Sequence, residues 1–103
     1  MNRIDRIAKM ENNLDVSAEA IEELSAALDK FEAAQKAWKQ LSDYYGSTQW
    51  MRDFEADEAG KLPKDLKRGV LSEDTVYDLI VESRELTARM AKLVSNAIED
   101  NLI

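Results

Sequence analysis

Apolar side chains recur every three or four residues along the first part of the chain, and this spacing places them on one face of an α-helix. The stripe keeps one heptad phase as far as residue 45. Its apolar members are Ile7, Met10, Leu14, Ile21, Leu24, Leu28, Phe31, Trp38 and Tyr45, and its polar members are Ser17, Gln35 and Ser42. The pattern therefore predicts one long helix over residues 2–45, ended by Gly46.

A run of polar residues, 12–17, is the weak point of this helix. Asn, Asp and Ser compete with helical hydrogen bonds, so Asp15 or Ser17 could cap a new helix there. The heptad phase nevertheless passes through the run unchanged. We therefore favour a continuous or merely kinked helix and keep a break near residues 13–17 as the alternative.

A second stripe occupies the C-terminal part of the chain. Its members are Val76, Leu79, Leu86, Met90, Leu93 and Ala97, widened by Ile80, Val94 and Ile98. Ser72 supplies an N-cap and the acidic Glu73 and Asp74 suit a helix start, so we predict a helix over residues 73–100. Leu71 and Val76 stand at the positions of a hydrophobic staple.

Glycine and proline residues interrupt the segment between these two helices. Ser47 or Thr48 can cap a short helix over residues 48–58, which Gly60 ends. Pro63 suits the first turn of another short helix over residues 63–67. The prediction is a single all-α domain over residues 1–103. It is either a long antiparallel, coiled-coil-like helical hairpin or a three-helix bundle, with a short helical segment between the long helices.

The two long helices differ in predicted length. They would span about 66 Å and about 42 Å, so antiparallel packing leaves about 24 Å of the first helix uncovered. Ile4, Ile7 and Met10 lie on that surplus. Either the chain folds back near Asn13, which gives the three-helix bundle, or a second copy covers the overhang, which gives a homodimer.

The amino-acid composition disfavours several classes of partner and of chemistry. The chain has 21 acidic and 14 basic residues and a net charge of −7, which disfavours nucleic acid and anionic membranes as partners. It lacks cysteine and histidine, and so lacks thiolate chemistry, the usual general base and the commonest zinc ligand. No apolar run approaches the roughly 20 residues of a membrane span, and no signal peptide is evident. We expect a cytoplasmic location and no cofactor.

The stretch from Tyr44 to Asp74 is distinctive. It contains Tyr-Tyr-x-Ser, then Trp, an Arg-Asp acidic stretch, Gly-x-Leu-Pro and Arg-Gly-Val-Leu-Ser-Glu-Asp, in that order. This order resembles an uncharacterised bacterial family, the domain of unknown function 4298. With its flanking helices the resemblance covers nearly the whole chain. It implies a small helical protein of about this length and no particular chemistry.

Two groups of residues in this stretch are candidate sites. Asp53 and Asp57 are four residues apart and would share a helix face, and with Asp74 they are weak candidates for a divalent-cation site. Five of the seven aromatic residues fall between 38 and 54 and form either a partner-docking face or a local mini-core. The candidates for an interaction surface are Tyr44, Tyr45, Trp50, Arg52, Asp53 and Arg68.

Two functions therefore stay open. We favour a non-enzymatic interaction or structural domain that self-associates through its helical stripe, with a further protein partner as an added role and no catalytic residue. The alternative is a divalent-metal-dependent or small-ligand-binding enzyme that uses helix carboxylates, similar to all-α nucleotide pyrophosphohydrolases. Glu19, Glu22 and Glu23 form one acidic set, and Glu82 and Glu85 form another. The separation of the sets is longer than in those enzymes, and the second set lacks their Asp.

Overall fold

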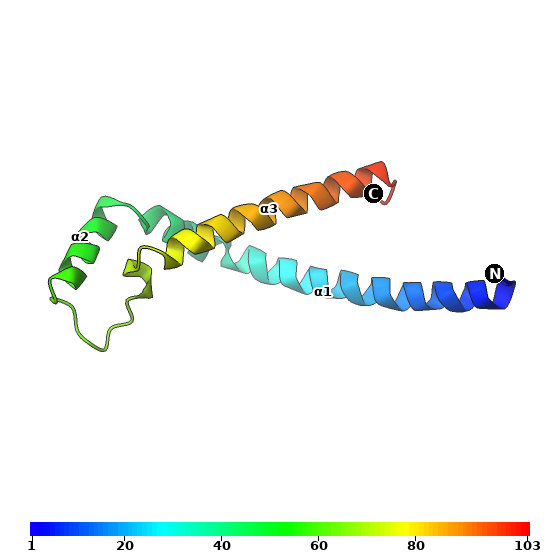
Figure 1. Cartoon of the computed structure of the whole chain (residues 1–103), viewed down its shortest axis with the longest axis horizontal. Coiled ribbons are helices and arrows are strands. Elements are labelled where there is room, and N and C mark those ends of the chain that lie inside the picture. The colour runs from blue at the N-terminus through cyan, green and yellow to red at the C-terminus, as the bar shows by residue number, and fades with distance from the viewer. The chain divides into compact units, whose positions relative to one another are not determined.

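A computed structural model describes all 103 residues of the chain. It contains three α-helices and one short 3₁₀ helix (Figure 1), which are α1 (Arg3–Tyr44), α2 (Thr48–Glu58), η1 (Gly69–Leu71) and α3 (Thr75–Glu99). No strand is present, so the predicted all-α class is confirmed. The chain divides into two units, Met1–Lys39 and Gln40–Ile103, and α1 contributes to both.

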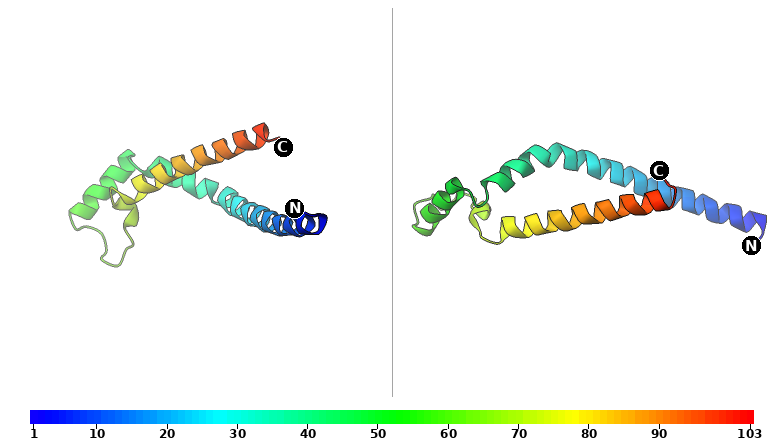
Figure 2. Two further views of the ribbon diagram at one scale, coloured as in Figure 1. Left: turned by 45° about the vertical axis from the view of Figure 1, so that its right-hand side comes forward. Right: turned by 90° about the horizontal axis from the view of Figure 1, so that it is seen from above.

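The first unit consists of α1 without its last turn. At its start, the Asp5 N–H donates a hydrogen bond to Oδ1 of Asn2 at 2.8 Å, which caps the helix. The helix continues through residues 12–17 without a break, and the views in Figure 2 show it as one uninterrupted coil. The fold-back near Asn13 therefore does not occur. The constant heptad phase was the better guide to this segment than the helix propensity of its polar residues.

The apolar stripe of α1 faces solvent along most of its length. None of the residues of α1 is buried. Seven large apolar side chains in its N-terminal half are between 51% and 78% exposed: Ile4, Ile7, Met10, Leu14, Val16, Ile21 and Leu24. Further along, Leu28 and Phe31 are 42% and 46% exposed. A single helix cannot cover its own apolar stripe.

The second unit contains the last turn of α1 together with α2, η1 and α3. Its core consists of Trp50, Leu71 and Val76, which are 7%, 6% and 2% exposed. One of them comes from α2, one from η1 and one from α3, and η1 contacts both neighbouring helices. This small core therefore joins the three elements, and the two residues predicted to form a hydrophobic staple both belong to it.

The boundaries of α2 follow the predicted caps. Ser47 is the N-cap, and its Oγ accepts a hydrogen bond from the Trp50 N–H at 3.1 Å. Gly46, with φ of 78°, separates α1 from α2, and Gly60, with φ of 68°, follows the end of α2. These are left-handed conformations that glycine adopts without a steric cost. The turn at Gly46 changes the direction of the chain so that Asp53 of α2 reaches Tyr44 at the end of α1.

The short helix predicted over residues 63–67 does not form. The chain makes a turn there, in which the Leu66 N–H donates to the Pro63 carbonyl at 3.2 Å. Helix nucleation is unfavourable unless tertiary packing supports it. Leu66 is 49% exposed, so the turn receives little such support.

The start of α3 also differs from the prediction. The helix begins at Thr75, and Asp74 rather than Ser72 occupies the N-cap position. Ser72 instead ends η1 in an extended conformation, and its N–H donates to the Gly69 carbonyl at 3.2 Å. Burial of the adjacent Leu71 holds the chain in this 3₁₀ turn and delays the helix by two residues. None of the helices combines the length and apolar composition that crossing a membrane requires.

Candidate functional site

The aromatic residues of the central segment gather around Trp50. Its ring meets that of Tyr45 edge-on, with centroids 5.2 Å apart, and stacks on that of Phe54 at 5.3 Å. Aromatic pairs of these geometries stabilise by about 0.5–1.5 kcal/mol beyond their burial. Since Trp50 is also among the buried residues, this arrangement has the form of a local mini-core.

Two aromatic donors also fix the chain at the entry to α3. Trp50 Nε1 donates to the Val70 carbonyl at 2.9 Å, and the Tyr45 hydroxyl donates to the Glu73 carbonyl at 2.9 Å. Both acceptors are main-chain oxygens that no helix ladder uses. The two bonds therefore hold the segment around η1 against α2 and the end of α1.

Tyr44 and Asp53 form a second link between α1 and α2. The Tyr44 hydroxyl donates to Oδ2 of Asp53 at 2.6 Å, and Gln49 Nε2 donates to Oδ1 of the same carboxylate at 3.4 Å. Hydrogen bonding to Asp53, with partial burial and the negative charge of that carboxylate, raises the pKa of Tyr44 to about 12. Tyr44 therefore remains a neutral donor at physiological pH.

Asp57 and Arg68 join α2 to the segment before η1. Asp57 Oδ1 lies 2.7 Å from a terminal nitrogen of Arg68, and the two side chains are 26% and 36% exposed. The pair borders an open hollow of about 390 Å³. Phe54 and Leu71 form part of its wall, and Glu58 and Glu73 add negative charge. Arg68 thus compensates only part of the acidic charge at this hollow.

The three metal candidates have different surroundings. Asp53 accepts hydrogen bonds from Tyr44 and Gln49, Asp57 pairs with Arg68, and Asp74 is exposed at the start of α3. The structure brings together no group of three or more acidic side chains that could hold a metal ion. Asp53 and Asp57 both lie on α2, and other side chains of the same chain engage both carboxylates.

The interaction-surface candidates divide into two classes. Tyr44, Tyr45, Asp53 and Arg68 are half-buried and bonded within the chain, and Trp50 is buried. Only Arg52 is exposed, on α2. These candidates were chosen by residue type alone. The sequence did not indicate that Trp50 and Tyr45 would donate to the carbonyls of Val70 and Glu73.

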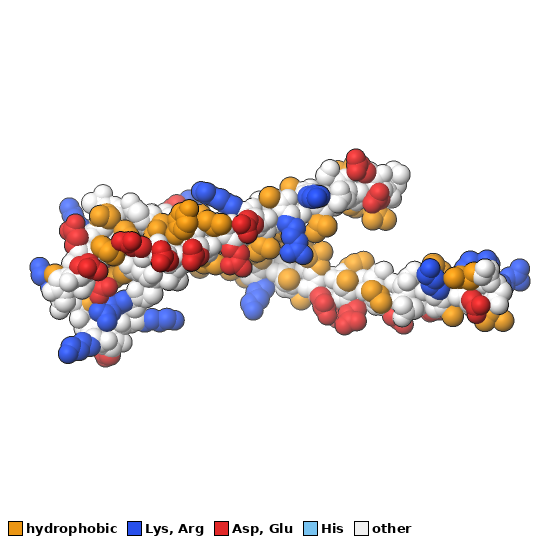
Figure 3. Space-filling view, viewed as in Figure 1, with side chains coloured by type: hydrophobic (Ala, Val, Ile, Leu, Met, Phe, Trp, Pro, Cys, Tyr) orange, Lys and Arg blue, Asp and Glu red, His pale blue; other side chains and the backbone are white.

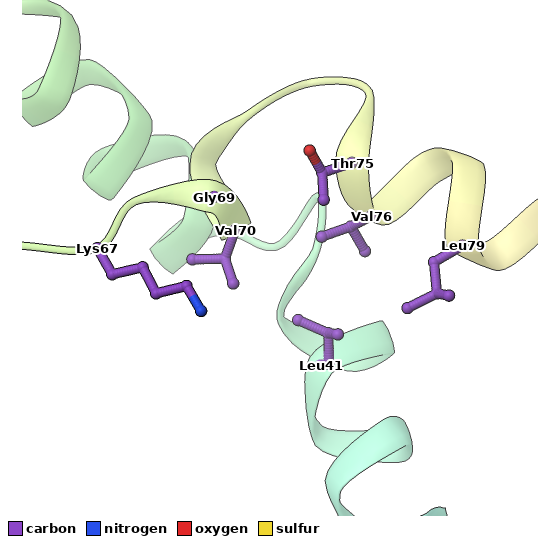
Figure 4. Close-up of a pocket in the computed structure, with 7 residues that line it drawn as sticks. All are labelled: Leu41, Lys67, Gly69, Val70, Thr75, Val76 and Leu79. Carbon is purple, nitrogen blue, oxygen red and sulfur yellow. The ribbon is translucent and has the colours of Figure 1, made fainter.

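A second hollow, of about 350 Å³, lies where the end of α1 meets η1 and the start of α3. Figure 4 shows four aliphatic side chains around it, with Lys67 at its edge. The aliphatic residues are Leu41, Val70, Val76 and Leu79, and Gly69 and Thr75 complete the lining. This hollow is suited to an apolar side chain rather than to polar chemistry.

Comparison with known proteins gives one match. Residues 7–93 match the model of a family described as Domain of unknown function (DUF4298). This match confirms the resemblance, which covers the central segment and most of both long helices. No curated protein and no solved structure matches the chain. The description of the family assigns no activity.

Proposed function

We propose that this chain, which belongs to the family Domain of unknown function (DUF4298), is a non-enzymatic interaction domain that forms a homodimer through α1. The observation that carries the proposal is the exposed stripe of α1, whose five N-terminal apolar members are each at least 51% exposed: Ile7, Met10, Leu14, Ile21 and Leu24. Large contiguous apolar patches are rare on monomers and usually mark interaction sites.

The periodicity of the stripe indicates what kind of surface covers it. A heptad repeat of apolar residues is the pattern by which one helix packs along another helix. The residues beside the stripe include Ala18, Ala20 and Ala27. Small flanking side chains allow two helix axes to approach closely, because the axial separation depends on the side chains at the contact. The face of α1 therefore fits a second long amphipathic helix, and a second copy of the chain supplies one.

The enzymatic alternative receives no comparable support. Asp53 and Asp57 are engaged by Tyr44 and Arg68, and no acidic cluster surrounds an open position. A further protein partner would have Arg52 and its neighbour Met51 as its exposed contacts on α2. The proposal also includes a cytoplasmic location, which the cysteine-free composition supports. It includes a bacterial origin, which the family resemblance supports.

The experiment compares two matched aspartate substitutions on α1. Ile21→Asp places a charge in the stripe, whereas Ala26→Asp places the same charge on the opposite side of the helix. Burying an isoleucine contributes about 1.5–3 kcal/mol, and a dimer contains two copies, so Ile21→Asp should raise the dimer Kd at least about 100-fold. Ala26→Asp should leave the Kd within a few-fold of the unmodified value.

Light scattering at several concentrations gives the molar mass, and far-UV circular dichroism shows that each variant remains helical. Equal dimerisation of the two variants would show that the stripe is not the interface. A monomeric mass for the unmodified chain would refute dimerisation itself.

A further inference from the structure

The hollow where the end of α1 meets η1 and the start of α3 is apolar except for one positive charge. Four of the residues that line it are aliphatic, and Lys67 is its only charged residue. In Figure 4 the side chain of Lys67 extends from the loop with its nitrogen directed toward the aliphatic side chains. No ion pair of the chain includes Lys67. An apolar hollow with an unpaired cation at its edge is complementary to an apolar group that has an anion beside it.

Two of the aliphatic side chains, those of Val70 and Leu79, lie at the surface rather than in the core. They are 42% and 44% exposed. The bond from Trp50 Nε1 to the Val70 carbonyl fixes η1, so that Leu71 enters the core while the side chain before it lines the hollow. The hollow is thus formed before any occupant arrives, which reduces the entropy that binding must cost.

The loop between α2 and η1 carries a group of basic residues, which are Lys61, Lys64, Lys67 and Arg68. Figure 3 shows basic side chains gathered on this loop. Arg68 is paired with Asp57, whereas the three lysines are exposed and belong to no ion pair. The loop side of the hollow therefore attracts anions, although the chain as a whole has a net charge of −7.

Acidic residues of the opposite side restrict where an anion can lie. Asp74 and Asp78 precede Thr75 and Leu79 in the sequence, and neither aspartate is part of the lining. Their negative charges disfavour a carboxylate on the α3 side of the hollow. The anion of an occupant is therefore expected on the loop side, beside Lys67.

Gly69 lines the same hollow, and the fold itself does not require a glycine there. Its φ lies outside the left-handed region, unlike those of Gly46 and Gly60. A Cβ added at Gly69 would meet no atom within 4 Å. The missing side chain does, however, let the main chain of an occupant approach closely.

We propose that this hollow is the docking site for an acidic segment of a partner protein. The segment inserts one apolar side chain between Val70 and Leu79 and places a neighbouring carboxylate beside Lys67. A peptide segment fits better than a free small molecule, because small-ligand pockets enclose most of their ligand and this hollow is open. The docking site shares no residue with the apolar stripe of α1, so it can be tested independently of the proposed homodimer.

Peptide titrations of the full-length chain, followed by NMR, test the docking site. The probe is the blocked peptide Gly-Asp-Asp-Leu-Gly, and two matched peptides replace either its leucine by glycine or both aspartates by lysine. Each is added to the nitrogen-15-labelled chain up to millimolar concentration. The probe should cause saturable shifts in the amide signals of Gly69, Val70, Thr75 and Leu79. Either replacement should raise the Kd at least about ten-fold.

Three substitutions in the chain locate the site. Gly69→Ala should raise the Kd of the probe at least about ten-fold without lowering the melting temperature, because alanine suits this backbone and restricts the unfolded chain. Lys67→Glu should raise the Kd by a similar factor. Lys61→Glu makes the same change on the same loop outside the lining, and should alter the Kd by less than about three-fold.

Four results would overturn the proposal. They are the absence of saturable shifts at the hollow, equal binding of the lysine peptide, undiminished binding by Gly69→Ala, and equal effects of Lys67→Glu and Lys61→Glu. Shifts of the same amide signals when the chain alone is diluted would assign the hollow to a second copy, and would also overturn it.

Discussion

Replacement of Trp50 by alanine should destabilise the second unit more than any other single change to its aromatic residues. The substitution removes the largest of the three buried side chains, its two ring contacts and its hydrogen bond to the Val70 carbonyl. Val70 is 42% exposed, so water can reach its carbonyl and the loss of that bond alone is modest. The cavity and the lost burial therefore dominate the effect.

The size of the effect follows from similar core truncations. Replacing a buried aromatic residue by alanine typically costs about 3–5 kcal/mol. Trp50→Phe keeps an aromatic ring in the core but loses the indole donor, and should cost about 1 kcal/mol. Met51 is adjacent on α2 and 45% exposed, so Met51→Ala is a matched control with an expected cost of about 0.5 kcal/mol or less.

Hydrogen exchange measured by mass spectrometry resolves this effect by segment. A loss of about 3–5 kcal/mol corresponds to a fall of roughly 150-fold to 5,000-fold in the protection of amides in α2 and η1. Protection in residues 4–24 of α1 should stay unchanged, because these residues belong to the other unit. If Trp50→Ala lowers protection in α2 no more than Met51→Ala does, the mini-core account is wrong.

Two further predictions concern the polar groups of the central segment. Because the pKa of Tyr44 rises from 10.0 to about 12 on folding, its bond to Asp53 stabilises the fold fully below pH 10 and ceases to do so as the pH rises to about 12. The difference in melting temperature between the unmodified chain and Tyr44→Phe should therefore be constant up to pH 10 and shrink above it, and a constant difference to pH 12 would contradict the assignment. Millimolar magnesium, manganese or calcium should leave the melting temperature unchanged, whereas a rise of several degrees that Asp53→Ala abolishes would support the metal-dependent alternative.

The long helices were predictable because heptad periodicity can be read from the sequence of each helix alone. It does not depend on which surface packs against the apolar stripe. The polar residues 12–17 weaken helix propensity only slightly. The unchanged phase of the surrounding stripe correctly predicted that the helix continues through them. Ser47 was predictable for a similar reason, because an N-cap bonds to an amide three residues away. The single domain over residues 1–103 stays a prediction, since the chain divides into two units.

The errors lie where remote contacts override local preference. Ser72 has the right residue type for an N-cap, but Trp50 and Tyr45 bond to the carbonyls of Val70 and Glu73 and fix the chain on both sides of it. The first bond joins residues that are 20 positions apart in the sequence, and the second joins residues that are 28 positions apart. No local sequence pattern predicts such bonds. The same limit applies to the candidate site. Residue type identified Tyr44 and Asp53, but their pairing depends on the turn at Gly46.

Homodimerisation through α1 is the central claim, and the solution mass of the unmodified chain tests it most directly. Sedimentation equilibrium over a wide range of concentration gives the weight-average mass without a shape assumption. The account predicts a mass that rises from the 11.7 kDa of one chain toward twice that value as concentration increases. A mass that stays at 11.7 kDa throughout would contradict it.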